Sequence, residues 1–209
     1  MKQKHYIDSH KGATFIYILA LIYFFQDVTS INNANIYIYI ALHGTYGILW
    51  IAKSRIFPDT QWEAKCSIRY GLLIWIGLSL YWISPYIIIT KNIQSPNWYF
   101  SMCISMYIFG IFLHFTSDMQ KFIQLKYNPN NLITDIMFSK IRNINYLGEL
   151  LIYLGFSSLA MHWIPIISLL IFIIIIWIPN MLKKDKSLSR YKNFKDYHKN
   201  TNRLFPFIW

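Results

Sequence analysis

The feature that most constrains this chain is an uncharged, strongly apolar run from Leu150 to Leu182. Its 33 residues would measure about 50 Å as one helix at ~1.5 Å per residue. The hydrocarbon core of a bilayer is only about 30 Å thick, so the run must fold back. We expect the bend at His162, Trp163 and Pro165, because proline is tolerated in the first turn of a helix and tryptophan favours the membrane interface.

Four further uncharged runs approach the length of a membrane span, at residues 12–26, 36–52, 70–90 and 97–115. With the two crossings of the long run, they predict an all-α polytopic membrane protein of about six transmembrane helices in a single domain, residues 1–209. Only 14% of the residues are charged, against about 25% in soluble domains. This composition excludes a disordered chain and a basic, nucleic-acid-binding globule, and two cysteines are too few for a disulfide scaffold.

Lysine and arginine are distributed unequally between the two sides of these predicted spans. One side receives only Lys91 and the other receives nineteen basic residues. The nineteen lie in four segments, residues 1–11, 53–69, 116–145 and 183–209. By the positive-inside rule, both termini are cytoplasmic, in a bacterial inner membrane or the endoplasmic reticulum, and the first helix is retained. We expect residues 116–145, with a turn cluster at 128–131, to form a loop close to the membrane.

Several polar residues fall at the cytoplasmic level of these spans. His114, Asp118 and Lys121 share one helix face at the end of the fourth span, and Asn145 and Glu149 have the same spacing at the start of the fifth. Ionisable groups within or beside spans are costly and are candidates for function. The alternative is that they are interfacial groups, with the carboxylate favourably placed at a helix N-terminus.

The tail, residues 183–209, contains eight basic residues interleaved with aromatic ones and ends in LFPFIW. It could lie on an anionic membrane leaflet. It could instead fold back over the helix ends and close a pocket for an anionic, planar cofactor, with arginine on phosphate and tyrosine over the ring. CxxC, HExxH, glycine-rich phosphate-loop and Ser/His/Asp patterns are absent from the sequence, so a nucleotide would be held by helix ends and loops.

Three phrases resemble, in order and spacing, the C-terminal domain of the steroid 5-alpha-reductase family, and most closely its short microbial members of unassigned substrate. They are NYLGELLIYLGFSSLAMHWIP, NMLKKDKSLSRY and FKDYHKNTNRLFPFIW. The resemblance covers roughly residues 105–209. It depends on residues 145–149 at the start of a helix pair and on Phe194, Asp196, Tyr197 and Pro206 in the closing segment.

The resemblance implies an NADPH-dependent membrane oxidoreductase that acts on CH–CH groups. Such an enzyme delivers hydride from the cytosolic side to an activated carbon–carbon double bond of a lipid-like substrate, such as a steroid, a polyprenoid or an enoyl thioester. Together with the polar residues at the cytoplasmic level of the predicted spans, the resemblance gives a set of candidate cofactor-binding residues. These are His114, Asp118, Lys121, Asn145, Glu149, Lys184, Arg190 and Tyr191.

The catalytic candidates are Asp27 and Tyr46. The phrase YFFQDVTS resembles the family's carboxylate phrase, with Asp27 in place of a glutamate, and Tyr46 on the next span is the natural partner tyrosine. Hydride addition to the β carbon of an enone builds negative charge on the carbonyl oxygen, which a tyrosine hydroxyl oriented by a carboxylate would stabilise in the transition state. By residue type alone, Tyr46 is also a packing residue and Asp27 a loop cap.

Two alternative functions remain open at this point. The first is an S-adenosylmethionine-dependent membrane methyltransferase of the isoprenylcysteine or phospholipid type. That family carries two adjacent glutamates after the last helix, where this chain has Asp185 and Lys186. The second is a non-catalytic lipid-binding protein of the same fold. All three functions predict a lipid-like partner and membrane lipids, with no nucleic acid and no metal.

Overall fold

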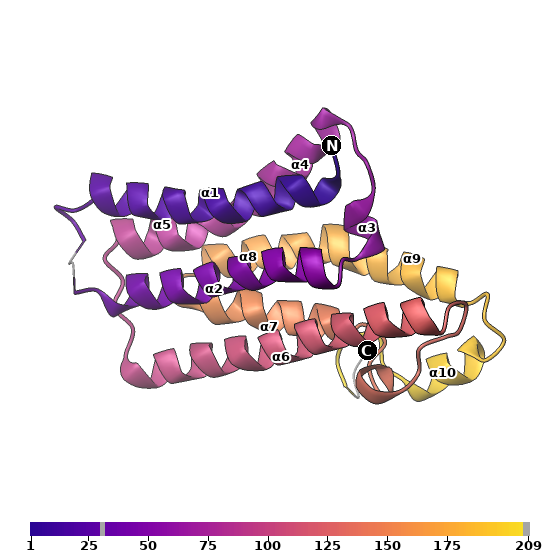
Figure 1. Ribbon diagram of the computed structural model, residues 1–209. Helices are drawn as coiled ribbons and strands as arrows, with labels where there is room; N and C mark the ends of the chain where they lie inside the picture. The colour runs from indigo at the N-terminus through magenta and orange to yellow at the C-terminus, as the bar shows by residue number, and fades with distance from the viewer. Residues whose placement is uncertain (30–31, 207–209) are drawn as a thin grey trace. The chain divides into compact units, whose positions relative to one another are not determined.

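A computed structural model describes residues 1–29 and 32–206, and all the regular secondary structure in these ranges is helical (Figure 1). Three helices are long and apolar enough to cross a membrane, and they span Ile68–Thr90, Asn97–Tyr127 and Trp163–Leu188. These findings confirm the all-α class and are those of a membrane protein, whereas six crossings stay a prediction. The last three residues of the LFPFIW phrase, 207–209, lie outside the described residues.

In chain order the helices are α1 (Gln3–Phe24), α2 (Ala34–Ile56), α3 (Thr60–Glu63), α4 (Ile68–Ser79), α5 (Ile83–Thr90), α6 (Asn97–Tyr127), α7 (Ile144–Ser158), α8 (Trp163–Phe172), α9 (Ile178–Leu188) and α10 (Phe194–Asn200). The longest connection, residues 128–143, joins α6 to α7. A 3-10 turn at Leu80–Trp82 joins α4 to α5, and another lies at Ile136–Phe138. A π-helical segment at Ile173–Trp177 joins α8 to α9.

The long apolar run is broken where the sequence predicts. Helix α7 ends at Ser158, Met161 turns the chain with a positive φ of 44°, and α8 begins at Trp163 with Pro165 in its first turn. The fourth apolar run differs from the expectation, because α6 continues to Tyr127 and the first part of the expected 116–145 loop is helical. Residues 116–127 are polar, but they contain neither glycine nor proline and consist largely of good helix formers.

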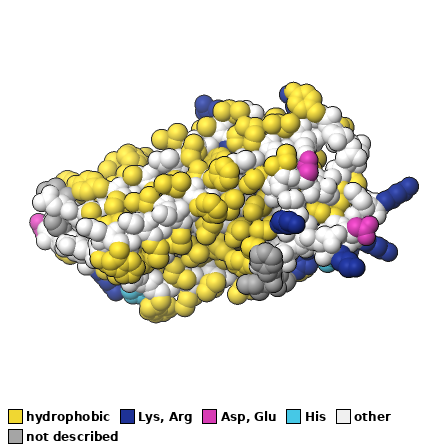
Figure 2. Space-filling view, turned by 90° about the horizontal axis from the view of Figure 1, so that it is seen from below, with side chains coloured by type: hydrophobic (Ala, Val, Ile, Leu, Met, Phe, Trp, Pro, Cys, Tyr) yellow, Lys and Arg dark blue, Asp and Glu magenta, His cyan; other side chains and the backbone are white. Residues whose placement is uncertain are grey.

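Apolar side chains cover much of the visible surface in Figure 2. Large ones are strongly exposed on the long helices, including Leu73 (66%), Ile108 (61%) and Phe109 (60%). Soluble monomers rarely expose contiguous apolar patches on this scale. The exposed apolar surface therefore supports a lipid environment around these helices.

The chain divides into two compact units, each described here by itself. Unit 1 comprises Met1–Tyr107 and Tyr153–Leu169, and unit 2 comprises Ile108–Ile152 and Leu170–Trp209. The single membrane domain over residues 1–209 stays a prediction.

Aromatic rings fill the core of unit 1. Helix α1 packs against α2, α4 and α5, and α2 contributes the fully buried Tyr39 and Tyr46. The ring of Tyr81 stacks on that of Tyr153, with centroids 4.6 Å apart, and Phe156 is also fully buried. Hydroxyl groups are thereby carried into the aromatic core of this unit.

Glycines bring α6 and α7 together in unit 2. A Cβ atom added to Gly148 would lie 2.4 Å from the backbone nitrogen of His114, and one added to Gly110 would lie 2.6 Å from the carbonyl oxygen of Gly148. Only glycine permits this approach without displacing a backbone. Beside it, a buried apolar cluster includes Leu113 and Ile144, so polar residues next to these positions on the two helices are also brought together.

Candidate functional site

The polar residues of α6 and α7 meet at this close approach in unit 2. The Nδ1 atom of His114 lies 3.1 Å from the backbone oxygen of Asn145, to which it donates when protonated. The Nε2 atom of the same ring lies 3.7 Å from Oδ2 of Asp118. His114 and Asp118 are both buried. The structure therefore brings together three of the residues proposed from sequence to bind the cofactor.

The amide oxygen of Asn145 is buried and has no hydrogen-bond partner among the residues that the structure describes. A buried acceptor without a donor costs about 1–3 kcal/mol, and a ligand that supplies an N–H group would recover this free energy. The nicotinamide ring of NADPH carries a carboxamide with such a group. The residues present therefore fit a nicotinamide cofactor at this position in unit 2.

Lys184 on α9 is held near the loop that precedes α7. Its Nζ atom donates to the backbone oxygen of Arg142 at 2.9 Å and lies 5.7 Å from the ring centroid of Phe138. Lysine is a point donor that suits phosphate. Lys121 and Glu149 are half-buried on α6 and α7.

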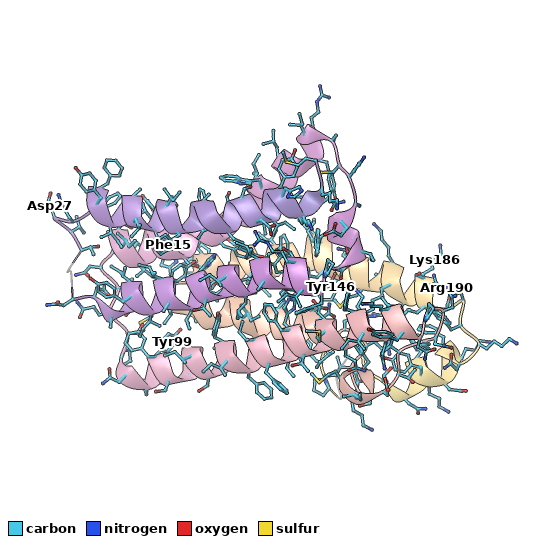
Figure 3. All side chains as sticks on the ribbon, viewed as in Figure 1. Phe15, Asp27, Tyr99, Tyr146, Lys186 and Arg190 are labelled. Carbon is cyan, nitrogen blue, oxygen red and sulfur yellow. The ribbon has the colours of Figure 1, made fainter. Side chains whose placement is uncertain are left out.

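Arg190 and Tyr191 follow α9 and contact each other. The guanidinium of Arg190 donates to the Tyr191 hydroxyl at 3.2 Å and lies 4.9 Å from the ring centroid. Arg190 is exposed at the end of α9 (Figure 3). Among the described residues, no recorded contact joins this pair to His114 or Asn145, so the structure does not bring the pair to the α6–α7 cluster.

Sequence reasoning missed an ion-pair network in the same unit. Asp185 on α9 accepts from Arg142 Nε at 3.2 Å and from Arg203 Nε at 2.9 Å. Arg142 is only 4% exposed and also donates to the backbone oxygen of Thr201 at 2.5 Å. These partners are up to 59 residues apart in the chain, so no local spacing could have revealed them.

Tyr197 on α10 makes a second connection between the tail and unit 2. Its hydroxyl donates to the backbone oxygen of Phe138 at 2.8 Å. Burial raises the pKa of Tyr197 above its ordinary value, so the phenol keeps its proton at all physiological pH values. The network around Asp185 and this hydrogen bond hold the tail against the loop that precedes α7.

The proposed catalytic tyrosine lies in the core of unit 1. Tyr46 is completely buried on α2, and its hydroxyl lies 3.3 Å from that of Tyr153 on α7. The Nζ atom of Lys11 on α1 lies 4.2 Å from the ring centroid of Tyr46. Tyr46 therefore has a hydroxyl neighbour and a cationic neighbour, each from a different helix.

Asp27 lies elsewhere in unit 1. It is exposed in the connection after α1, at the end of that helix opposite its N-terminus (Figure 3). Tyr46 is twelve residues into α2, which is about 18 Å along the helix axis. The structure does not bring Asp27 and Tyr46 together, and the hydroxyl group beside that of Tyr46 belongs to Tyr153.

These observations define a helical membrane protein with a buried polar cluster that suits a nicotinamide cofactor. A family model described as 3-oxo-5-alpha-steroid 4-dehydrogenase matches residues 73–209, well over half of the chain. The chain therefore belongs to this family, which is an oxidoreductase family acting on CH–CH groups. The match confirms the resemblance to the steroid 5-alpha-reductases and extends it from residue 105 back to residue 73. No curated protein sequence matches the chain.

Proposed function

We propose that this protein is an integral membrane reductase that uses NADPH to reduce an activated carbon–carbon double bond in a lipid-like substrate. The family match over residues 73–209 carries the proposal. The buried amide oxygen of Asn145 supports a nicotinamide cofactor in unit 2. Enones and enoyl lipids are the substrate class, because only a conjugated double bond is polarised enough to accept hydride at carbon.

In this proposal, unit 2 holds NADPH, which supplies the hydride when bound. The amide oxygen of Asn145 would accept from the nicotinamide carboxamide. His114, which lies beside Asp118, contacts the Asn145 backbone and would hold it in place. Of the remaining candidates, Lys121, Lys184 and Arg190 would bind the phosphates and Tyr191 would cover a ring. Glu149 stays a candidate without an assigned contact.

Unit 1 polarises the substrate. As hydride adds to the β carbon, negative charge develops on the carbonyl oxygen, and the Tyr46 hydroxyl donates a hydrogen bond to it. The Tyr153 hydroxyl, 3.3 Å away, orients that donor, and the Lys11 ammonium near the ring favours negative charge at this position. Asp27 remains a candidate carboxylate for the same step. The resulting enolate takes a proton from water at the α carbon, which completes the saturated product.

The membrane arrangement is part of the same proposal. Six helical segments cross the membrane, formed by α1, α2, α4 with α5, α6, α7, and α8 with α9, and both termini are cytoplasmic. Nineteen of the twenty basic residues then lie on the cytoplasmic side. A cysteine introduced at Lys195 should react with an impermeant reagent only from the cytoplasmic side, and one introduced at Lys91 only from the opposite side.

The cofactor is tested by thermal unfolding of the detergent-purified protein with NADPH, NADH or S-adenosylmethionine. A ligand at ~100 times its Kd stabilises by ~2.7 kcal/mol, so NADPH should raise the Tm. Asn145→Ala should reduce this shift, and the exposed Asn200→Ala should retain it. A shift with S-adenosylmethionine instead would indicate a methyltransferase, and no shift in a folded sample would favour a lipid-binding protein.

The role of Tyr46 is tested by turnover. Tyr46→Phe should lower kcat by at least ~10²-fold, the usual contribution of a positioned acid, while the Tm shift with NADPH is retained. Tyr37→Phe removes an exposed hydroxyl from the same helix and should be neutral. Full activity of Tyr46→Phe would exclude this tyrosine as the proton donor.

A further inference from the structure

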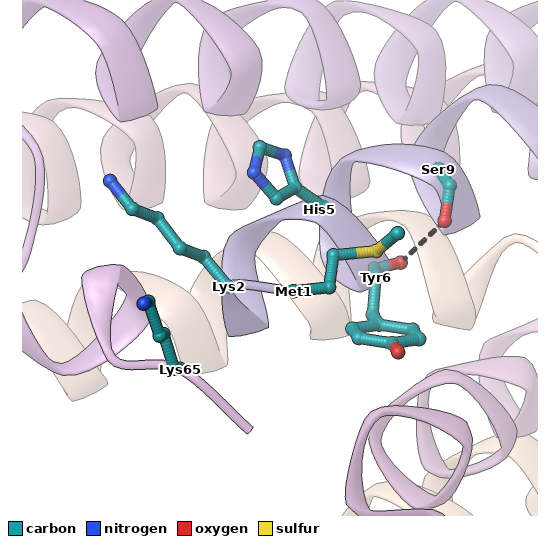
Figure 4. Close-up of a pocket in the computed structure, with 6 residues that line it drawn as sticks. All are labelled: Met1, Lys2, His5, Tyr6, Ser9 and Lys65. Atoms are coloured by element: carbon teal, nitrogen blue, oxygen red, sulfur yellow. Dashed lines mark hydrogen bonds between the residues drawn. The ribbon is translucent and has the colours of Figure 1, made fainter. Parts of the chain in front are cut away.

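A second polar site lies in unit 1, at the N-terminal end of α1. A cavity of about 700 Å³ opens there between the first turns of α1 and the connection from α3 to α4 (Figure 4). It is lined by Met1, Lys2, His5, Tyr6, Ser9 and Lys65. The lining contains basic and hydroxyl side chains and no carboxylate, so it is suited to an anion.

Backbone hydrogen bonds join the two walls of this cavity. The Gln3 nitrogen donates to the Ala64 oxygen, and the Cys66 nitrogen donates to the Met1 oxygen, each at 3.0 Å. The two segments thus pair as a short antiparallel bridge. The cavity walls are therefore fixed by the fold.

The ring of Tyr6 is fixed as well. It packs directly on Gly71 of α4, where an added Cβ atom would lie 2.2 Å from the ring. Ser9, one turn further along α1, donates its hydroxyl to the Tyr6 backbone oxygen at 3.0 Å. Both side chains line the cavity in Figure 4, so two hydroxyl groups are held in its wall.

The charge at the cavity is positive. Glu63 lies outside the lining and accepts from Lys2 at 2.6 Å and from Lys4. These hydrogen bonds hold the pKa of Glu63 below its ordinary value, so the carboxylate is ionised and orients Lys2. The Lys65 ammonium forms no ion pair or hydrogen bond with the residues described in the structure. Lys65, with His5 beside it in the lining, is thus available to an external anion.

Apolar surface begins immediately beside the cavity. The uncharged run of α1 starts at residue 12, and the membrane-length helix that contains α4 starts at Ile68. Helices α1 and α4 pack together, and α4 begins beside the N-terminus in Figure 1. Both expose large apolar side chains further along, namely Phe15, Ile16, Ile68, Leu72 and Leu73. A ligand with an anionic head and apolar chains is complementary to this combination.

We propose that this cavity binds the phosphate group of an anionic membrane lipid, with Lys65 and His5 on the phosphate and the acyl chains along α1 and α4. The Lys65 ammonium supplies charge-assisted hydrogen bonds, and the His5 ring and the Tyr6 hydroxyl supply further donors. The site involves unit 1 alone and no residue assigned to NADPH or to Tyr46. It therefore goes beyond the reductase function and stands whether or not that function is correct.

The test measures binding of a short-chain phosphatidylglycerol to the full-length protein in detergent by native mass spectrometry. Lys65→Gln should weaken binding by about fivefold, which corresponds to ~1 kcal/mol for one basic residue at a membrane surface. Lys65→Arg should restore it, and Ser9→Phe should abolish it by filling the cavity. Lys195→Gln makes the same charge change on the exposed face of α10 and should bind as the unmodified protein does.

Three results would overturn the proposal. Unchanged binding in both Lys65→Gln and Ser9→Phe would place the lipid elsewhere. If phosphatidylcholine with the same acyl chains bound as tightly as phosphatidylglycerol, the site would not be selective for an anionic head group. Displacement of the lipid by inorganic phosphate at low millimolar concentration would assign the cavity to a soluble phosphate. The Tm shift with NADPH, measured on the same variants, separates failure of this site from failure of the cofactor site.

Discussion

The two units bury charge in different ways. In unit 2, buried charges are paired with opposite charges, with Arg142 and Arg203 against Asp185. In unit 1, buried ammonium groups lie over aromatic rings. Lys11 lies 4.2 Å from the ring of Tyr46, and Lys53 lies 4.8 Å from that of Trp50.

The difference matches the chemistry proposed for each unit. Ion pairs need carboxylates and backbone acceptors, which the loops and the tail of unit 2 supply, and such surroundings suit a charged cofactor. An aromatic face attracts a cation without adding a carboxylate, so in unit 1 a buried ammonium lies beside the ring of Tyr46. Four substitutions would break or sharpen this comparison.

The largest effect is expected for Asp185→Asn. The substitution leaves the buried Arg142 without its carboxylate, and breaking a buried ion pair typically costs about 3–5 kcal/mol. The free energy of unfolding in detergent, measured by chemical denaturation, should fall by this amount. Asp196→Asn makes the same change at an exposed position on α10 and should alter stability by less than about 0.5 kcal/mol. Equal effects of the two would show that the network is not structural.

Gly148→Ala should have the next largest effect. Its methyl group would meet the His114 backbone 2.4 Å away, and overpacking of this kind costs about 1–3 kcal/mol. It should also weaken the Tm shift with NADPH, because α6 and α7 must separate at Asn145. Gly77→Ala has no heavy atom within 4 Å and should be neutral or stabilising. A neutral Gly148→Ala would mean that the two helices do not pack so closely.

Lys11→Met should cost about 0.5–2 kcal/mol, the range measured for cation–π contacts. The loss should be smaller than that for Asp185→Asn, because the substitution removes the buried charge itself and leaves an apolar side chain of similar length in its place. Thermal unfolding of both variants in the same detergent makes the comparison, with the exposed Lys192→Met as the control. A loss as large as that of Asp185→Asn would remove the distinction between the two units.

Tyr197→Phe should have the smallest effect, about 1 kcal/mol, through loss of the hydrogen bond to Phe138. The pKa of Tyr197 is raised in the folded protein, so its contribution to the free energy of unfolding is complete below the ordinary tyrosine pKa of 10.0. This contribution is lost as the pH rises above that value, because the tyrosine ionises first in the unfolded chain. Stability measured from pH 8 to pH 11 should therefore converge for the two proteins at the alkaline end. The exposed Tyr127→Phe should follow the unmodified protein throughout.

Hydropathy was sufficient to predict the helical class of this fold and the position of one break. The helical segments follow the apolar runs, and the break before Trp163 follows from the excess length of one run. The extension of α6 to Tyr127 was not predicted, because a polar helix that leaves the hydrocarbon carries no apolar signal. A search for helix breakers, which are absent from residues 116–127, would have found it.

The candidate site was only partly predictable, for a different physical reason. His114, Asp118 and Asn145 stand out because polar groups are costly near a membrane, and the structure brings them together. The pairing of Asp185 with Arg142 was missed, since 43 residues separate them and tertiary packing alone makes them neighbours. Likewise, Tyr153 lies in an apolar run, where only the structure reveals its hydroxyl beside that of Tyr46.

The π-helical segment at Ile173–Trp177 has a consequence for how this family member could vary. One π turn accommodates one more residue than an α turn, so it amounts to a single-residue insertion absorbed within the isoleucine run. The side chains of α9 are thereby rotated about the helix axis by about 100° relative to their positions in an uninterrupted α-helix. Deletion of one of these isoleucines would restore the α-helical phase and turn Lys184 and Asp185 away from Arg142. The number of residues in this apolar stretch therefore sets the direction in which the following charged side chains point.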